Sequence, residues 1–392
     1  MYSMDCGGIE KAAVSILRAL PKDVFDITLI LDCKKGPFLN LVPKEVKVIE
    51  LTTTEIYKLH TNMGDKKWLY YSLIHGYFKE FLLMAIYAIK SLFISFEQKK
   101  ILRAKLLSKN ISFSQEHFDY IFAYSNKEQL YYATNNYNAD QCITWLHREI
   151  DLKREDIRYY LPLYKKCSKI YGVSQKVVDS FIKYCPSVGN ITEVYYNLID
   201  KKLGIELAEK YTLSHPNKAF WFLTVGRLTK QKGIDIIPNI ALLLKNKGIS
   251  FVWSIIGNGP LLINLKEKIR ELELEDYIIV EGEKSNPYPY FKSCDVYLQP
   301  SRYEGYCITI AEARMFTKPI VATNFAGASE QLENGKAGKI VDFGIESFAN
   351  GIIEVITNNN LQKQYTENLA KQQIDTTDTI ATIIKYMTSN KL

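Results

Sequence analysis

The chain has 392 residues, of which 47% are hydrophobic and 24% charged, and its formal net charge is +7. This length exceeds one ordinary hydrophobic core, so two domains are expected, and the balanced composition excludes a disordered or low-complexity protein. The longest uncharged apolar run, residues 81–89, is too short to span a bilayer. The seven cysteines form no Cys-x-x-Cys motif or Cys/His cluster, so we expect cytosolic thiols without disulfides or zinc.

Short apolar segments alternate with helical patterns along the whole chain. Strands are expected at residues 26–31, 46–49, 120–124, 142–146, 169–173 and 193–196, and in the second half at 220–225, 251–256, 277–281, 296–299, 320–323 and 338–341. This alternation predicts an α/β fold of two doubly wound domains with parallel sheets. The polar stretch 200–217 marks the seam between them. Ligands of such sheets bind beyond the carboxyl ends of the strands, so the cleft between the domains is the expected site.

A glycine pair, Gly7-Gly8, opens the first helical pattern. Adjacent glycines at a helix start let a backbone approach a phosphate closely, although such a pair is more often a simple turn. Only six residues precede the pair. Either the first strand is very short, or the true start of the protein lies upstream.

Most of the positive charge lies in residues 64–109, where nine lysines and arginines and three acidic residues give a net charge of +6. Apolar residues alternate with these lysines at loosely helical spacing; they include Phe81, Leu82, Ile86, Leu92 and Phe93. Two interpretations remain open: a surface helix on an anionic membrane, or an amphipathic helical pair that covers the first sheet. The excess charge favours the membrane interpretation. No motif of a nucleic-acid-binding fold accompanies it, so no nucleic-acid partner is expected.

His147 directly follows the expected strand 142–146. A lone histidine at a strand end is usually structural or solvated, but its place at the carboxyl end favours a role in ligand binding. Arg227 and Lys232 flank the loop after strand 220–225. Two cations aimed at one spot would neutralise a diphosphate, and solvated loop charges are an equally weighted alternative.

Two glycine turns follow the next strands. Gly257, in Ile256-Gly257-Asn258-Gly259-Pro260, lines a ligand or merely turns the chain. Gly282 lies between Glu281 and Glu283, directly after the expected strand 277–281.

Glu304 and Glu312 are separated by seven residues and follow strand 296–299, with Gly305 at the turn. A strand, a glycine turn and a helix start present free N–H groups and the positive end of a helix dipole, which suits phosphate. Carboxylates accept several hydrogen bonds and so suit sugar hydroxyls. At 1.5 Å rise per residue the two carboxylates can lie about 10 Å apart, the reach of a nucleotide sugar.

Taken in order, these segments resemble the retaining family 4 glycosyltransferases, which make bacterial surface polysaccharides and have two Rossmann-like domains facing a cleft. The resemblance is strongest over residues 220–341. Its motifs are Val225-Gly226-Arg227 with Lys232-Gly233, Ile256-Gly257-Asn258-Gly259-Pro260, Asn286-Pro287-Tyr288, Ser301-Arg302-Tyr303-Glu304-Gly305, Ala311-Glu312-Ala313, and Lys318-Pro319-Ile320-Val321-Ala322-Thr323. One departure is Tyr306-Cys307, which replaces a more usual Phe and small residue.

The resemblance implies an acceptor-side domain at residues 1–198 and a nucleotide-sugar donor-binding domain at 199–377, with a C-terminal helix at about 378–392 packing back on the first. It implies transfer of a hexosyl or N-acetylhexosaminyl group, with retention, to a hydroxyl of a surface-polysaccharide or lipid-linked oligosaccharide acceptor. The implied catalytic residues are Glu304, Arg227, Lys232 and His147. The implied donor-binding residues are Gly8, Gly257, Gly282, Gly305, Tyr306, Cys307 and Glu312, the last as ribose ligand. Backbone groups of the loop Glu281-Gly282-Glu283 would select the nucleotide base.

The expected cofactor is none beyond the nucleotide sugar itself. Arg227 and Lys232 would replace the metal that other transferases use, and the sequence contains no Asp-x-Asp motif. The expected location is cytoplasmic, peripheral on the inner face of the cell membrane. Two other functions stay open: a nucleotide-sugar 2-epimerase of the same fold, and an inactive sugar-nucleotide-binding partner.

Overall fold

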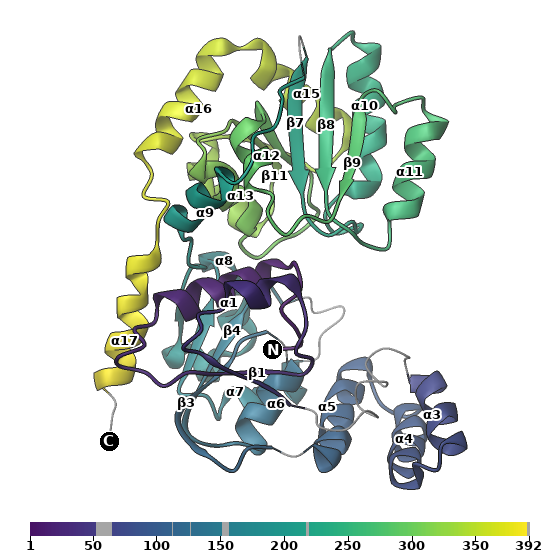
Figure 1. Cartoon of the computed structure of the whole chain (residues 1–392), viewed down its shortest axis with the longest axis vertical. Helices are drawn as coiled ribbons and strands as arrows, with labels where there is room; N and C mark the ends of the chain where they lie inside the picture. The colour runs from purple at the N-terminus through teal and green to yellow at the C-terminus, as the bar shows by residue number, and fades with distance from the viewer. Residues whose placement is uncertain (52–64, 112, 126, 151–156, 217–218, 390–392) are drawn as a thin grey trace. The chain divides into compact units, whose positions relative to one another are not determined.

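The computed structural model describes residues 1–51, 65–111, 113–125, 127–150, 157–216 and 219–389. The chain divides into two compact units. The first comprises Met1–Asp5, Leu20–Tyr195 and Ile383–Leu392, and the second comprises Cys6–Ala19 and Tyr196–Thr382. Figure 1 shows the chain as a ribbon. The sequence interpretation gives the first helix to the acceptor-side domain, but α1 (Gly8–Ala19) is grouped with the second unit.

The first unit contains two parallel sheets among its described residues. β1 (Thr28–Leu31) pairs with β2 (Lys47–Glu50), and a four-stranded sheet has the order β3-β4-β5-β6. The strands of the larger sheet are β3 (His117–Ala123), β4 (Asn138–Leu146), β5 (Lys169–Gly172) and β6 (Thr192–Val194). The helices are α3 (Asp65–Ile74), α4 (Phe78–Ser91), α5 (Phe96–Leu107), α6 (Lys127–Asn135), α7 (Leu161–Tyr164) and α8 (Gln175–Tyr184).

The start of the chain runs beside β1 without forming an assigned strand. The backbone N–H groups of Asp32 and Cys33 donate to the carbonyls of Met1 and Tyr2 at 2.8 and 2.7 Å. At the other end, α17 (Ile380–Ser389) enters the first unit, where the Tyr120 hydroxyl donates to the carbonyl of Met387 at 2.9 Å. Both ends of the chain therefore have hydrogen-bonded contacts with the strands of this unit.

The second unit is built on one six-stranded parallel sheet with the order β12-β11-β10-β7-β8-β9. Its strands are β7 (Phe220–Val225), β8 (Phe251–Ile256), β9 (Ile278–Gly282), β10 (Val296–Gln299), β11 (Ile320–Thr323) and β12 (Lys339–Val341). The other elements are α9 (Lys201–Ala208), α10 (Ile237–Asn246), α11 (Leu262–Glu271), α12 (Tyr288–Ser293), α13 (Ile308–Met315), α14 (Ala326–Gln331), α15 (Ile345–Thr357) and α16 (Asn359–Lys371). The α/β prediction with parallel sheets is therefore confirmed, and each expected strand is present.

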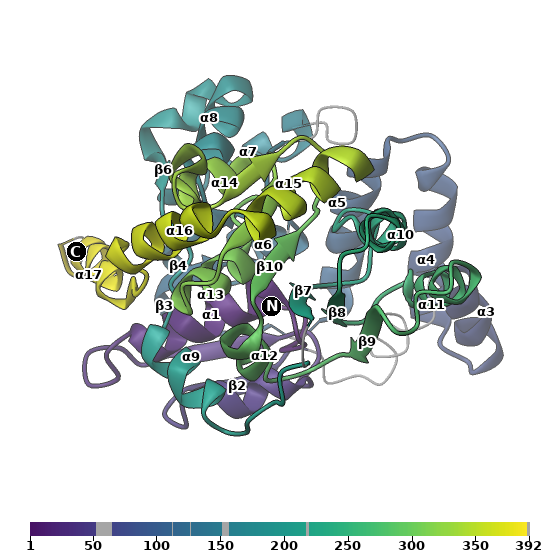
Figure 2. The ribbon, with the colours of Figure 1, turned by 90° about the horizontal axis from the view of Figure 1, so that it is seen from above.

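Helices cover both faces of this sheet, which explains why its central strands are apolar throughout. One core cluster joins Phe222 and Trp253 to α10 and α15, and a second joins Leu223 and Tyr297 to α12 and α13. Figure 2 shows α10 and α15 on one side of the strands and α12 and α13 on the other. Because these strands pair in parallel, the carboxyl ends of β7, β8, β9 and β10 lie along one edge.

Candidate active site

Close-packed glycines bring the ends of β7 and β8 together. Gly257 has φ +147, and a Cβ there would lie 1.9 Å from the carbonyl oxygen of Gly226. Gly233 has φ +71, and a Cβ there would lie 1.8 Å from the carbonyl oxygen of Pro300. Only glycine is compatible with both approaches. The loop after β7 is therefore held directly against the loop after β10.

Lys232 and Glu304 form an ion pair at this edge, with Nζ and Oε1 2.7 Å apart and side-chain exposures of 18% and 10%. Burial opposes the charge of Lys232, but the Glu304 carboxylate outweighs that effect and raises the pKa of the ammonium. Arg227, on the same loop, is exposed, and its charge acts on Lys232. The structure thus brings together all three charged residues predicted for this unit's catalytic set.

A chain of buried hydrogen bonds leads to Glu304. The Ser301 hydroxyl donates to Glu304 Oε1 at 2.9 Å, and the Gln299 amide donates to Ser301 at 2.7 Å. Thr309 donates to the Gln299 side-chain oxygen at 3.0 Å, and the Tyr297 hydroxyl donates to the same oxygen. Gln299 and Ser301 are fully buried. These contacts fix the orientation of the Glu304 carboxylate before any ligand arrives.

Further side-chain contacts join the loop after β7 to the loop after β10. Arg302 makes two hydrogen bonds to the Asp235 carboxylate, at 2.7 and 2.8 Å, and donates to the carbonyl of Lys230. Gln231 donates to the carbonyl of Tyr303 at 3.1 Å. Planar, two-point Arg–carboxylate contacts are strong and directional. These contacts therefore hold the loop that carries Arg227 and Lys232 in a defined position relative to Glu304.

The amino end of α13 lies immediately after Glu304. Cys307 is the residue before the helix and has φ +63, the left-handed region that favours glycine. Burial raises the pKa of its thiol to about 11, so the sulfur is protonated at neutral pH. Gln331 donates to the carbonyl of Tyr306, which anchors the loop to α14. The N–H of Ile310 donates to the carbonyl of Cys307 at 3.1 Å, and no side chain of the described residues caps this end of α13. The amino end of a helix carries a partial positive charge, so it can bind an anion.

Gly282 ends β9 beside the same edge. It has φ +74 with open space where a Cβ would lie, and its carbonyl accepts from the N–H of Gly257 at 2.8 Å. The predicted base-selecting turn is thus next to the β8 turn. Its contact with a base remains a prediction.

Helix α1 supplies Gly8 and Lys11 to the second unit. A Cβ on Gly8 would lie 3.5 Å from Cδ1 of Ile308, the first residue of α13. One turn later, the Lys11 ammonium forms an ion pair with Glu312 Oε1, and Glu312 is 2% exposed. Gly8 was predicted to reach the phosphate from the first domain, whereas it is grouped with the donor-side residues. The Lys11–Glu312 pair and the approach of Gly8 to Ile308 are two contacts of α1 within that unit.

His147 belongs to the first unit, directly after β4. Its Nε2 donates to the carbonyl of Tyr124 at 2.5 Å. Burial lowers the pKa of the imidazole to about 4, and the carbonyl only partly offsets this effect. The ring is therefore neutral at pH 7 with its proton on Nε2, and Nδ1 is an acceptor.

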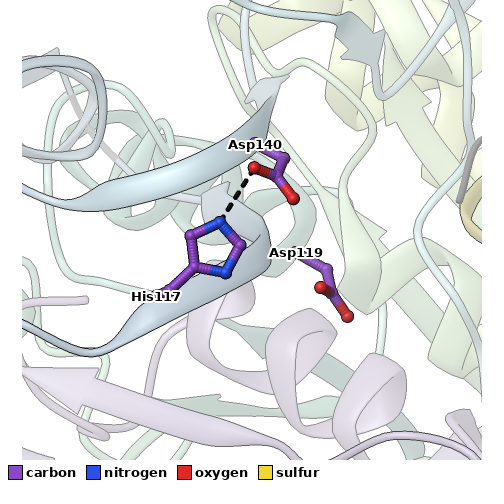
Figure 3. Close-up of side chains that lie close together, drawn as sticks. All are labelled: His117, Asp119 and Asp140. Carbon is purple, nitrogen blue, oxygen red and sulfur yellow. Dashed lines mark hydrogen bonds and ion pairs between the residues drawn. The ribbon is translucent and has the colours of Figure 1, made fainter. Parts of the chain in front are cut away.

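Two other features lie at the amino ends of strands. His117, Asp119 and Asp140 are exposed, with His117 Nε2 2.8 Å from Asp140 Oδ1 (Figure 3). In the second unit a hollow of about 810 Å³ lies before β7, β8, β10 and β11, with His215 and Lys318 in its lining. Neither is at the carboxyl edge where ligands of such sheets bind.

Sequence reasoning missed several residues of the site. Lys11 lies three residues after Gly8, and Tyr288 lies within a quoted motif, but neither received a role, because the partners of Lys11 are remote in the sequence. Gln299, Ser301 and Asp235 also received none. A polar residue at the end of an apolar strand or just after it could have identified Gln299 and Ser301, since a buried polar residue needs a partner.

Comparisons with known proteins show which family model, relatives and solved structures the chain is similar to. Residues 208–372 match the family model described as "Glycosyl transferases group 1". The N-acetylgalactosamine-N,N'-diacetylbacillosaminyl-diphospho-undecaprenol 4-alpha-N-acetylgalactosaminyltransferase of Campylobacter jejuni is 28% identical over 56% of this chain and 58% of its own length. The amylovoran biosynthesis glycosyltransferase AmsK of Erwinia amylovora is 30% identical over 36% of this chain and 38% of its own. The matched part of the chain thus spans less than two thirds of these relatives.

Solved structures extend the likeness of fold to the whole chain. The crystal structure of Anabaena Alr3699/HepE in complex with UDP and glucose aligns with a TM-score of 0.70, at 18% identity, over 99% of this chain and 98% of that one. A glycosyltransferase from Rickettsia africae aligns with a TM-score of 0.66, at 18% identity, over 100% and 99%. The chain therefore has the two-Rossmann-domain fold that the resemblance implies, and its residues 208–372 match the model of the glycosyl transferases group 1 family.

Proposed function

We propose that this chain is a retaining glycosyltransferase that moves a sugar from a nucleoside diphosphate to a hydroxyl of a glycan or lipid-linked acceptor. The observation that carries the proposal is the Lys232–Glu304 pair, 2.7 Å apart, beside the amino end of α13. A fixed cation, a fixed carboxylate and the positive amino end of a helix are the partners that a diphosphate-linked sugar requires. The names of the relatives support the transferase class over the 2-epimerase and over an inactive binding partner.

The proposed chemistry is mostly electrostatic. The bond from the anomeric carbon to the diphosphate breaks as the acceptor oxygen attacks the same face, and the departing phosphate oxygen takes the acceptor proton. Lys232 and Arg227 stabilise the negative charge that develops on the diphosphate. Glu304 accepts hydrogen bonds from sugar hydroxyls, and Glu312 accepts them from the ribose. Lys232 and Arg227 are two fixed cations that take the place of a metal ion.

His147 is proposed as a neutral partner of the sugar. A histidine whose pKa is lowered to about 4 is a neutral imidazole at pH 7, so it does not act as a general acid. It acts through Nδ1 as a hydrogen-bond acceptor, because Nε2 is engaged by the carbonyl of Tyr124.

A thermal-shift screen tests the donor site, because a ligand that binds only the folded state raises the melting temperature. The probes are UDP, GDP, ADP and dTDP against the wild type, Lys232→Met and Lys266→Met, the last being an exposed lysine of α11. At least one nucleoside diphosphate should raise the melting temperature of the wild type and of Lys266→Met, and much less that of Lys232→Met. Equal increases in melting temperature in all three proteins would contradict the proposal that Lys232 binds the diphosphate.

We also propose that α3 and α4 contact an anionic membrane. Eight of the sixteen exposed large hydrophobic residues of the described chain lie between Tyr70 and Phe93. In α4 they form one stripe, since Phe78, Leu82 and Ile89 recur at helical spacing with exposures of 70, 60 and 63%. Leu92 and Phe93 follow, at 77 and 82%.

The opposite face of α4 is already used. Met84 and Tyr87 are buried in a cluster with Leu106 of α5, so the exposed stripe does not serve that packing. Phe81 and Ile86, which the sequence analysis names among the apolar residues that alternate with these lysines, are half-buried. Lys79 and Lys90 are exposed beside the stripe. Apolar residues flanked by lysines are typical of helices that lie in the interface of an anionic membrane. No helix of the described residues is long and apolar enough to cross a membrane.

A further inference from the structure

A buried ion pair links two helices that are far apart in the sequence. Lys11 lies on α1 and Glu312 lies on α13, and their side chains are 18% and 3% exposed. Burying two charges is costly unless they are paired and hydrogen-bonded. The pair is therefore a specific feature of the second unit that needs an explanation.

Tyr288, the first residue of α12, completes the surroundings of Lys11. The Lys11 ammonium lies 4.3 Å from the centroid of the Tyr288 ring, which is 5% exposed. Burial opposes the charge of Lys11, but Glu312 and Tyr288 together raise the pKa of the ammonium above its usual range. Lys11 thus stays charged at neutral pH and forms part of a three-residue cluster.

Helices α1 and α13 lie side by side and point the same way. Gly8 lies against Ile308 at their first residues, and Lys11 meets Glu312 one turn later. Two parallel helices with adjacent amino ends place two positive dipole ends together, which favours an anion at that point. The Lys11–Glu312 pair has no net charge, so the positive ends remain available to an anionic ligand.

We propose that Lys11 is a positioning residue for the nucleotide ribose, acting through Glu312. This inference rests on the proposed function, in which Glu312 accepts hydrogen bonds from the ribose hydroxyls. Lys11 engages Oε1 of Glu312. A carboxylate has about four lone-pair sites on two oxygens, so the other oxygen keeps its acceptor capacity for a ribose diol. Lys11 thereby fixes both the charge and the orientation of the carboxylate.

Calorimetric titration with matched ligands separates this role from a purely structural one. The probes are UDP, GDP and ADP, followed by the 2′-deoxy and 3′-deoxy forms of whichever binds the wild type most tightly. The proteins are wild type, Lys11→Met, Lys11→Arg, the double variant Lys11→Met/Glu312→Gln, and Lys266→Met as an exposed-lysine control. The double variant removes both charges of the pair, so it stays testable if Lys11→Met alone does not fold.

The wild type, Lys11→Arg and Lys266→Met should bind the ribo form at least about tenfold more tightly than the deoxy forms, as expected for a lost hydrogen bond to a charged group. Lys11→Met should bind the ribo form about tenfold more weakly and the deoxy forms with unchanged affinity. The double variant should behave like Lys11→Met, because residues that act as a unit are not additive.

Two results would overturn the inference while leaving the proposed function intact. One is that Lys11→Met prefers the ribo form over the deoxy forms by the same factor as the wild type does. The other is an equal loss of affinity for both forms, which would mean that Lys11 contacts the phosphates directly. If the wild type binds none of the nucleoside diphosphates, the proposed function itself fails, and this inference fails with it.

Discussion

At the scale of single residues, the position of Glu304 depends on Ser301, which donates to its Oε1 at 2.9 Å. Ser301→Ala removes a buried hydrogen bond to a charged group and should lower kcat for sugar transfer by about tenfold, with little change in melting temperature. Ser347→Ala, at a half-buried position of α15, is the matched control. A kcat for Ser301→Ala within twofold of wild type would exclude the positioning role.

The backbone at Cys307 makes a second residue-level prediction. Its φ of +63 is a conformation that glycine adopts freely and that a β-branched residue rarely adopts. Cys307→Val should lower the free energy of unfolding by about 2 kcal/mol more than Cys307→Gly does. Cys294→Val supplies the control, because Cys294 is also fully buried but has φ −66. Denaturant unfolding of the three variants measures the difference, and equal losses for both Cys307 variants would contradict it.

The sequence was sufficient to identify the charged residues of the site, because each lies within a few residues of a strand end. Arg227 and Lys232 follow β7, and Glu304 follows β10, so topology alone places them on one edge. Sequence-based prediction could not identify Lys11, because its partner Glu312 lies 301 positions away. Pairings of that kind depend on helix packing, which a local pattern does not encode.

At the scale of elements, the strands were predictable because each is a short apolar run bounded by turn residues. The first strand was not, since Met1 and Tyr2 bond to the backbone of Asp32 and Cys33 without forming an assigned strand. The basic segment contains three helices, α3, α4 and α5, where the sequence left a surface helix or a helical pair open. Apolar residues on two faces of α4 blur the helical period, which explains why its exposed stripe was not resolved.

The stripe on α4 leads to a prediction about membranes. The wild type should co-sediment with vesicles containing phosphatidylglycerol, less so in high salt, and weakly with neutral vesicles, because salt screens the attraction of lysines to anionic lipid. Leu82→Glu/Phe93→Glu should abolish binding. Ile263→Glu, at a position 72% exposed on α11, should leave it unchanged. Equal binding to both lipids, or an Ile263→Glu defect as large as that of the double variant, would contradict a specific α4 surface.

At the scale of the whole molecule, His147 makes stability depend on pH. Burial lowers its pKa in the folded chain to about 4, below the usual 6.5. Between these pH values the unfolded chain binds more protons, so this residue's contribution is full above pH 6.5 and is lost as the pH falls towards 4. Asp32 acts in the opposite sense, because burial raises its pKa to about 6. The test is therefore a comparison: the free energy of unfolding of the wild type should fall more than that of His147→Gln from pH 6.5 to 4. An equal loss of unfolding free energy in the two proteins over this pH range would contradict the lowered pKa of His147.

The proposed replacement of a metal by fixed cations also concerns the complete reaction. Transfer should persist after chelation with EDTA, because Lys232 and Arg227 supply the positive charge. Lys232→Met should lose about 3 kcal/mol of transition-state stabilisation, the magnitude expected for one preorganised charged donor. Loss of transfer in EDTA with recovery in magnesium or manganese would show that the fixed cations are insufficient.

The central claim is that the carboxyl edge of the second unit's sheet activates a nucleotide sugar. The most direct measurement is mass-spectrometric analysis of the wild type, Lys232→Met and Lys266→Met incubated with a panel of nucleotide sugars. The account predicts that the wild type and Lys266→Met release a nucleoside diphosphate and transferred or free sugar from at least one donor, and that Lys232→Met does so at least about a hundredfold more slowly. Interconversion of nucleotide sugars without diphosphate release, or equal rates in all three proteins, would contradict it.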